Sequence, residues 1–134
     1  QYEPDRLLMP GGESFEQVQS RAVQAFVDIV RRESGRVIAL TSHMLTIQLV
    51  MCRLLNVPIR EVWNMVRLEN TSLTTMKISE NGDYAITKWA DDSHLPENLK
   101  NPYVKIAGFV TPNFKAVLDI SDVEGMHHFD CFAL

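Results

Sequence analysis

The sequence predicts an α/β fold with three layers, in which helices cover both faces of a mostly parallel sheet. Between residues 14 and 55, an amphipathic helix pattern, a short apolar run and a second apolar helix pattern follow one another. The apolar run has no polar alternation, which is typical of a strand covered on both faces in a parallel sheet. The length of 134 residues fits one compact domain as the default.

The first helix is predicted over residues 14–33. Ser14 and Gln17 have the spacing of a capping box, and the Ser34-Gly35 pair predicts the end of the helix. Apolar residues recur along it at steps of three and four, at Phe15, Val18, Ala22, Ala25, Phe26 and Ile29. The preceding residues 1–12 hold two prolines and two glycines and are predicted to form a loop.

The apolar run at residues 37–40 predicts a buried, central strand that reaches residue 41. A second helix is predicted from Met44 to about residue 55, and Pro58 closes it. Residues 59–65 fit a further short helix.

Residues 73–79 and 84–90 are rich in residues that favour strands, and Asn81-Gly82 between them supplies a tight turn. We expect a hairpin at an edge of the sheet. Beyond Asp91 the patterns become weak, because three prolines interrupt short apolar stretches such as 104–110 and 116–120.

Composition excludes several classes of partner. The net charge of −4 and the absence of a long Lys/Arg run give no basic surface for nucleic acid. The longest apolar stretch has about twelve residues, whereas a membrane helix needs roughly twenty. Two cysteines make no disulfide framework, and the first ten residues show no secretory signal. We therefore expect a soluble protein in the cytoplasm.

The strongest candidate for a functional site is the junction between the predicted strand and the second helix. Ser42, His43 and Met44 would lie at the carboxyl end of the strand, where open α/β sheets bind ligands. The free N–H groups of the helix start favour an anion, and a protonated imidazole would add a charge-assisted hydrogen bond to phosphate. The alternative is structural: His43 could cap the helix or donate to a backbone carbonyl.

The sequence lacks the characteristic motifs of several other kinds of functional site. We find no phosphate-binding Gly-x-x-x-x-Gly-Lys loop, no Cys-x-x-Cys pair and no Gly-x-Ser-x-Gly turn. His127 and His128 are adjacent, so their side chains diverge and no third ligand is suitably spaced. We expect neither a metal ion nor a cofactor.

Several short motifs occur in one order along residues 10–95. They are GES at 12–14, VIALTSH at 37–43, CRLLNVP at 52–58, LENTSL at 68–73 and DDSHL at 91–95. In this order they resemble the histidine phosphatase superfamily, also called phosphoglycerate mutase-like. The resemblance implies a phosphoglycerate mutase-like fold and metal-free transfer or hydrolysis of phosphate on small phosphorylated metabolites. Arg21, among apolar neighbours, is expected to pair with an acid such as Glu13 and so order the loop before the first helix.

The resemblance also implies roles at the strand-helix junction. His43 corresponds to the second active-site histidine of the family, which binds the phosphoryl group and stabilises its charge. The backbone N–H of Met44 would assist, and Ser42 would lie beside the phosphate. Most relatives have glycine where this chain has Met44, so its side chain would crowd the mouth of the pocket. His94, in the closing motif, is expected to be structural and to fasten the last strand.

The family's nucleophilic histidine belongs to an Arg-His-Gly motif that precedes the GES helix. None of the four histidines in this sequence follows an arginine. We therefore expect residues 1–95 to represent the C-terminal half of the family domain, with its N-terminal part missing and residues 96–134 as an extension of unknown role. Alone, the chain should not turn over substrate, and a second chain or a homo-oligomer could complete it. The alternative is a non-catalytic interaction or regulatory module that retains the fold.

Overall fold

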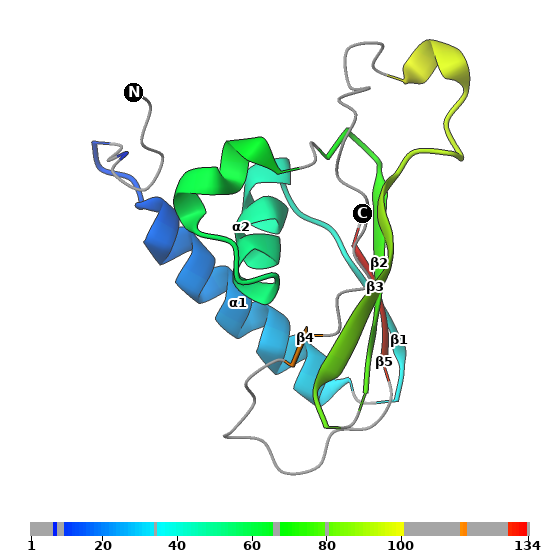
Figure 1. Cartoon of the computed structure of the whole chain (residues 1–134), viewed down its shortest axis with the longest axis horizontal. Coiled ribbons are helices and arrows are strands. Elements are labelled where there is room, and N and C mark those ends of the chain that lie inside the picture. Colours follow the sequence, from blue (N-terminus) through cyan, green and yellow to red (C-terminus); the bar gives the residue numbers. More distant parts are fainter. Residues whose placement is uncertain are drawn as a thin grey trace.

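The computed structural model describes residues 7, 10–33, 35–65, 68–79, 81–100, 116–117 and 129–133. The elements follow in the order α1 (Phe15–Arg32), β1 (Val37–Leu40), α2 (Met44–Leu54), η2 (Ile59–Asn64), β2 (Leu73–Ile78), β3 (Asp83–Asp91), η3 (Glu97–Leu99), β4 (Ala116–Val117) and β5 (Phe129–Ala133). Both α-helices lie on the same side of the sheet (Figure 1). The predicted α/β class is therefore confirmed.

Helix α1 begins and ends within one residue of the prediction. The Gln17 N–H donates to Ser14 Oγ at 3.2 Å, and the Ser14 N–H donates to Gln17 Oε1 at 2.8 Å, which completes the capping box. Gly35 follows the helix with a positive φ of 74°, a conformation that glycine adopts without a steric penalty. Local signals in the sequence thus define this element.

The strands form one five-stranded sheet with the order β1-β5-β2-β3-β4. Strand β5 pairs with β1 in parallel and with β2 in antiparallel orientation, and β2 with β3 and β3 with β4 are antiparallel. One of these four described pairings is parallel, so the prediction of a mostly parallel, three-layer arrangement is not confirmed. Strand β5 comes from the predicted extension, and the proposed boundary at residue 95 stays a prediction.

The prediction that residues 37–41 form a central, buried strand is wrong, although the strand is parallel to its neighbour. Strand β1 lies at an edge of the described sheet, and Val37 is 65% exposed while Ile38 is buried. Side chains along a strand point alternately to opposite faces, and α1 and α2 lie over one face only. A run of four apolar residues does not encode how many layers cover the strand.

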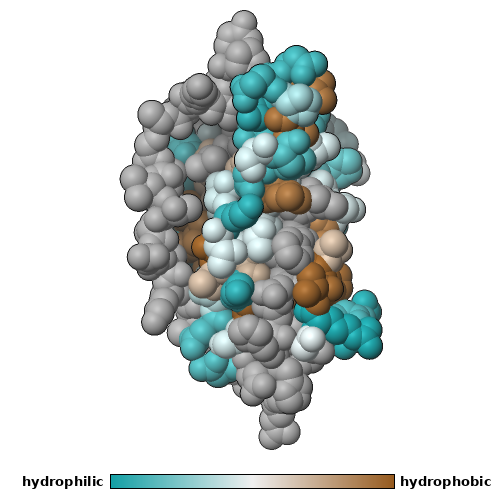
Figure 2. All heavy atoms as spheres, turned by 90° about the vertical axis from the view of Figure 1, so that its right-hand side faces the viewer, coloured by the Kyte–Doolittle hydropathy of each residue, from teal (hydrophilic) through white to brown (hydrophobic). Residues whose placement is uncertain are grey.

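Figure 2 views the molecule from the side of the sheet that faces away from the helices. Among the coloured residues, hydrophobic groups are scattered between hydrophilic ones on this side.

The predicted hairpin is confirmed. Strands β2 and β3 pair from Leu73 with Asp91 to Ile78 with Tyr84, and Gly82 in the turn has a φ of 84°. On its outer side, β3 pairs with the two-residue strand β4 only at Asp83 and Tyr84. Most of β3 therefore lies at the edge of the described sheet, as expected.

Two clusters of buried side chains fix the position of α2. One cluster joins both helices to the sheet through Phe26, Val30, Ile38, Met51, Leu54, Met76, Ile78 and Tyr84. The other joins α1, α2 and η2 through Phe15, Leu49, Cys52 and Val62. Because α2 contributes to both clusters, its amino end is held at a fixed place beside the end of β1. No helix in the described part of the chain is long and apolar enough to cross a membrane.

Candidate functional site

His43 lies between the end of β1 and the start of α2. It is the N-cap residue of α2, with φ −83° and ψ 148°, and its carbonyl accepts from the Ile47 N–H at 3.1 Å. Its side chain makes no capping hydrogen bond and is exposed. Within the residues that the structure describes, the backbone of His43 serves the helix and its imidazole is free to contact a ligand.

The amino end of α2 favours a negative charge. The first N–H groups of a helix have no partner within the helix and form its positive end. The first turn of α2 contains no acidic residue. Anions such as phosphate bind well at this kind of site.

A polar cavity of about 160 Å³ opens at this helix end. Ser42, His43 and Met44 line one side of it. The opposite side comes from the segment before and within β2, and its lining residues are Leu68, Glu69, Asn70, Thr71, Ser72 and Thr74. Two sequence motifs that are 25 residues or more apart therefore form the walls of one cavity.

The wall opposite His43 contains a turn with unusual backbone geometry. Thr71 has a positive φ of 65°, which is uncommon for a β-branched residue, and the Ser72 N–H donates to the Glu69 carbonyl at 3.0 Å. Strained backbone of this kind concentrates at binding sites, where the surrounding structure holds it in place. The turn brings Ser72 and Thr74 to the cavity, although both side chains are almost fully buried.

The structure brings together all three residues predicted for the phosphate site, since Ser42, His43 and Met44 line the same cavity. Sequence reasoning assigned no site role to Asn70, Ser72 or Thr74. The signal was present in the LENTSL motif, which carries four consecutive polar residues immediately before a strand. Their position opposite His43 depends on how β2 packs, which the local sequence does not specify.

The predicted pairing of Glu13 with Arg21 is confirmed. Arg21 Nε and Nη2 donate to the two carboxylate oxygens of Glu13, each at 2.7 Å. Arg21 lowers the pKa of the Glu13 carboxyl by donating these hydrogen bonds. The ion pair connects the loop before α1 to the second turn of the helix. It uses the Nε and Nη2 donors of the Arg21 guanidinium.

The closing motif is organised by Asp91, and His94 is exposed. Asp91 accepts from Lys88 Nζ at 2.8 Å and from the Ser93 N–H at 3.1 Å, which lowers the pKa of its carboxyl. Together with the Ala90 N–H, which donates to Thr74 Oγ1 at 3.2 Å, these contacts of Asp91 hold the end of β3.

No group of three or more His, Cys, Asp or Glu side chains could hold a metal ion in the part of the chain that was searched, the described residues. His127 and His128 lie outside those residues. Cys52 is fully buried, and burial raises the pKa of its thiol to about 11. At neutral pH this thiol is therefore protonated and unsuited to act as a nucleophile.

Comparison with known proteins decides the family. The family model of the histidine phosphatase superfamily (branch 1) matches residues 1–92. The chain belongs to this superfamily. The matched range is the N-terminal part of this chain and contains Ser42, His43 and Met44. Searches of curated proteins and of solved structures give no match.

Membership in the histidine phosphatase superfamily agrees with the α/β architecture and with the resemblance found in the sequence motifs. It supports a phosphatase or mutase-like family function for the domain.

Proposed function

We propose that the polar cavity between β1, α2 and β2 is the phosphate-binding part of a histidine phosphatase site. The observation that carries the proposal is the exposed His43 side chain, which makes no capping bond and lines a polar cavity at the positive end of α2. Family membership supports it, because the resemblance gives this histidine the same role.

Each of the three proposed site residues would contribute a hydrogen bond to the phosphoryl group. A protonated His43 imidazole donates to one oxygen and stabilises its negative charge. The backbone N–H of Met44 and the hydroxyl of Ser42 donate to other oxygens. In phosphoryl transfer such fixed donors stabilise the charge of the transition state, which is usually the largest contribution to catalysis. A small phosphorylated metabolite is the substrate class that we propose.

The nucleophile must come from another segment. The 134 residues contain no Arg-His-Gly sequence, and the family's phosphohistidine chemistry needs that histidine. We infer that these residues correspond to the C-terminal half of the family domain. The nucleophile would then be supplied by further residues of the same polypeptide, by a second chain or by an oligomer. The edge of β1 offers a place for such a segment, because only β5 pairs with β1 among the described strands.

The lack of an Arg-His-Gly sequence in these residues also favours a second candidate, a non-catalytic interaction or regulatory module that retains phosphate binding. The two candidates differ in whether a nucleophile is ever added. If the gene encodes an Arg-His-Gly segment upstream, the longer chain should hydrolyse p-nitrophenyl phosphate and lose that activity in His43→Ala. A longer chain that contains the segment and stays inactive would favour the module.

The 134-residue chain alone provides the direct test. We expect p-nitrophenyl phosphate hydrolysis at background, together with weak binding of inorganic phosphate that His43→Ala removes. Robust turnover by this chain, abolished by His43→Ala, would mean that His43 is itself the nucleophile and that the assignment of roles is wrong.

A further inference from the structure

We propose that the phosphate site takes phosphomonoesters whose organic group is apolar, and that this group occupies a second cavity between the sheet and the helices α1 and α2. The inference rests on the proposed function, because it assumes that the phosphate lies at His43. It adds the chemical class of the rest of the ligand.

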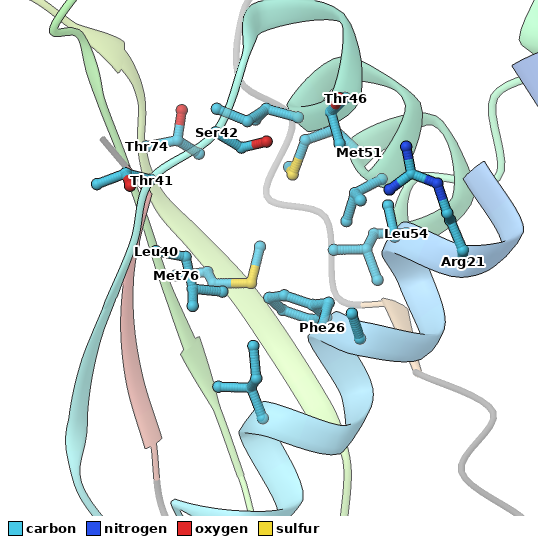
Figure 3. Close-up of a pocket in the computed structure, with 15 residues that line it drawn as sticks. Arg21, Phe26, Leu40, Thr41, Ser42, Thr46, Met51, Leu54, Thr74 and Met76 are labelled. Atoms are coloured by element: carbon cyan, nitrogen blue, oxygen red, sulfur yellow. The ribbon is translucent and has the colours of Figure 1, made fainter. Parts of the chain in front are cut away.

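The second cavity has a volume of about 260 Å³, which approaches the lower end of the range of about 300 to 1,000 Å³ for small-molecule sites. Figure 3 shows Leu40 and Met76 on the side of the sheet, with Phe26, Met51 and Leu54 facing them from the two helices. The small side chain of Ala22 on α1 leaves part of this space open.

The two cavities adjoin each other. Ser42, Ile47 and Thr74 line both of them, so these three side chains form the boundary between the polar and the apolar space. Ser42 lies at the end of the apolar cavity that is nearest to the start of α2 (Figure 3). A ligand with its phosphate at His43 can therefore place its substituent past Ser42 into the apolar cavity.

The lining of the apolar cavity selects against charged or strongly polar substituents. Arg21 is the single charged residue among its described lining residues, and its Nε and Nη2 donate to the Glu13 carboxylate, which neutralises its charge. The hydroxyl of Thr74 already accepts from the Ala90 N–H at 3.2 Å. A carboxylate or a sugar would lose its hydration here without gaining full hydrogen bonding, whereas an alkyl or aryl group would lose nothing.

The test compares n-hexyl phosphate with methyl phosphate and with phosphoglycolate, whose organic group is charged. Binding to the 134-residue chain is measured by NMR titration. Each methylene removed from water strengthens binding about fourfold, so burial of only two methylenes makes hexyl phosphate more than about tenfold tighter than methyl phosphate. Phosphoglycolate should bind no better than methyl phosphate.

Two variants test where the organic group of the phosphate ester binds. Ala22→Phe fills the apolar cavity and should abolish the advantage of hexyl phosphate while leaving methyl phosphate binding unchanged. Ala85→Phe adds the same side chain at an exposed position of β3 that does not line the cavity, so it should retain the advantage. Thermal unfolding verifies that both variants fold, and Ala25→Trp replaces Ala22→Phe if the latter does not.

The outcomes separate the two claims. If hexyl and methyl phosphate bind equally and His43→Ala weakens both, the apolar site is wrong and the phosphate site stands. If Ala22→Phe keeps the hexyl advantage, the substituent binds elsewhere and the inference is overturned. If His43→Ala leaves the binding of every phosphate unchanged, the proposed function itself fails.

Discussion

Replacing His43 by alanine should leave the stability of the fold almost unchanged, although the residue begins a helix. The structure provides the matched control, because α1 begins at Ser14 with a complete capping box and α2 begins at His43 with no side-chain bond. A comparison of His43→Ala with Ser14→Ala therefore tests whether the imidazole has a structural role.

The expected magnitudes follow from these contacts. Ser14→Ala removes a hydrogen bond of 3.2 Å to the Gln17 N–H, and loss of such a cap costs about 1 kcal/mol. The His43 side chain is exposed and makes no capping hydrogen bond. His43→Ala should therefore change the free energy of unfolding by no more than about 0.5 kcal/mol. With an m-value of about 2 kcal/mol per molar urea, Ser14→Ala lowers the midpoint by roughly 0.5 M and His43→Ala by half of that or less.

Urea unfolding followed by circular dichroism measures both midpoints, and unchanged m-values verify that the variants are comparable. Equal losses of stability in the two variants would refute the reasoning. They would mean that the His43 imidazole supports the start of α2 and is not reserved for a ligand.

Three further predictions concern stability and titration. Leu49→Ala should lower the free energy of unfolding by about 2 to 5 kcal/mol, because the Leu49 side chain is fully buried. Leu99→Ala, at a 65% exposed position, should change it by less than about 0.5 kcal/mol. Equal effects of the two variants in urea unfolding would contradict the described core. Since burial raises the pKa of Cys52 to about 11 from 9.0, the unfolded thiol ionises first, and the free energy of unfolding should fall as pH rises from 9.0 through about 11. Cys52→Ala should show a smaller fall over this range, and an identical pH profile would count against the burial. Arg21 lowers the pKa of Glu13 below 4.5, so the pair stabilises the fold above that pH and its contribution is lost on further acidification. Urea unfolding of the unmodified chain and of Glu13→Gln at pH 3 and pH 6 should show a smaller loss of stability at pH 3 in the variant. An equal loss in both proteins would contradict the pairing.

Sequence reasoning succeeded where structure is encoded locally. The capping box at Ser14 located the start of α1, and Asn81-Gly82 located the turn of the hairpin. It failed for the layout of the sheet, because strand order depends on contacts between distant segments. Residues 129–133 pair with β1 on one side and with β2 on the other, and no further described strand pairs with β1, which therefore lies at the edge of the described sheet. No short pattern around residues 37–40 contains that information.

The same distinction applies to the candidate site. His43 could be predicted because it lies at a strand-helix junction whose two elements follow one another in sequence. The opposite wall, with Ser72 and Thr74, becomes apparent only when β2 is packed against the sheet. The apolar cavity is lined by Ala22 of α1 together with Leu40 and Met76 of the sheet, residues that are far apart in the sequence. The helical period of the sequence places Ala22 on the inner face of α1. It does not identify the residues that lie opposite this small side chain and line the cavity.

The central claim is that phosphate binds at His43, and titration of the ¹⁵N-labelled chain with inorganic phosphate tests it most directly. We predict saturable shifts of the His43 and Met44 amides, with millimolar affinity because one imidazole and a few N–H groups supply only about 1.5 to 3 kcal/mol per charged contact. His43→Ala should abolish these shifts while the remaining spectrum is preserved. Shifts that are centred elsewhere, or that persist unchanged in His43→Ala, would contradict the account.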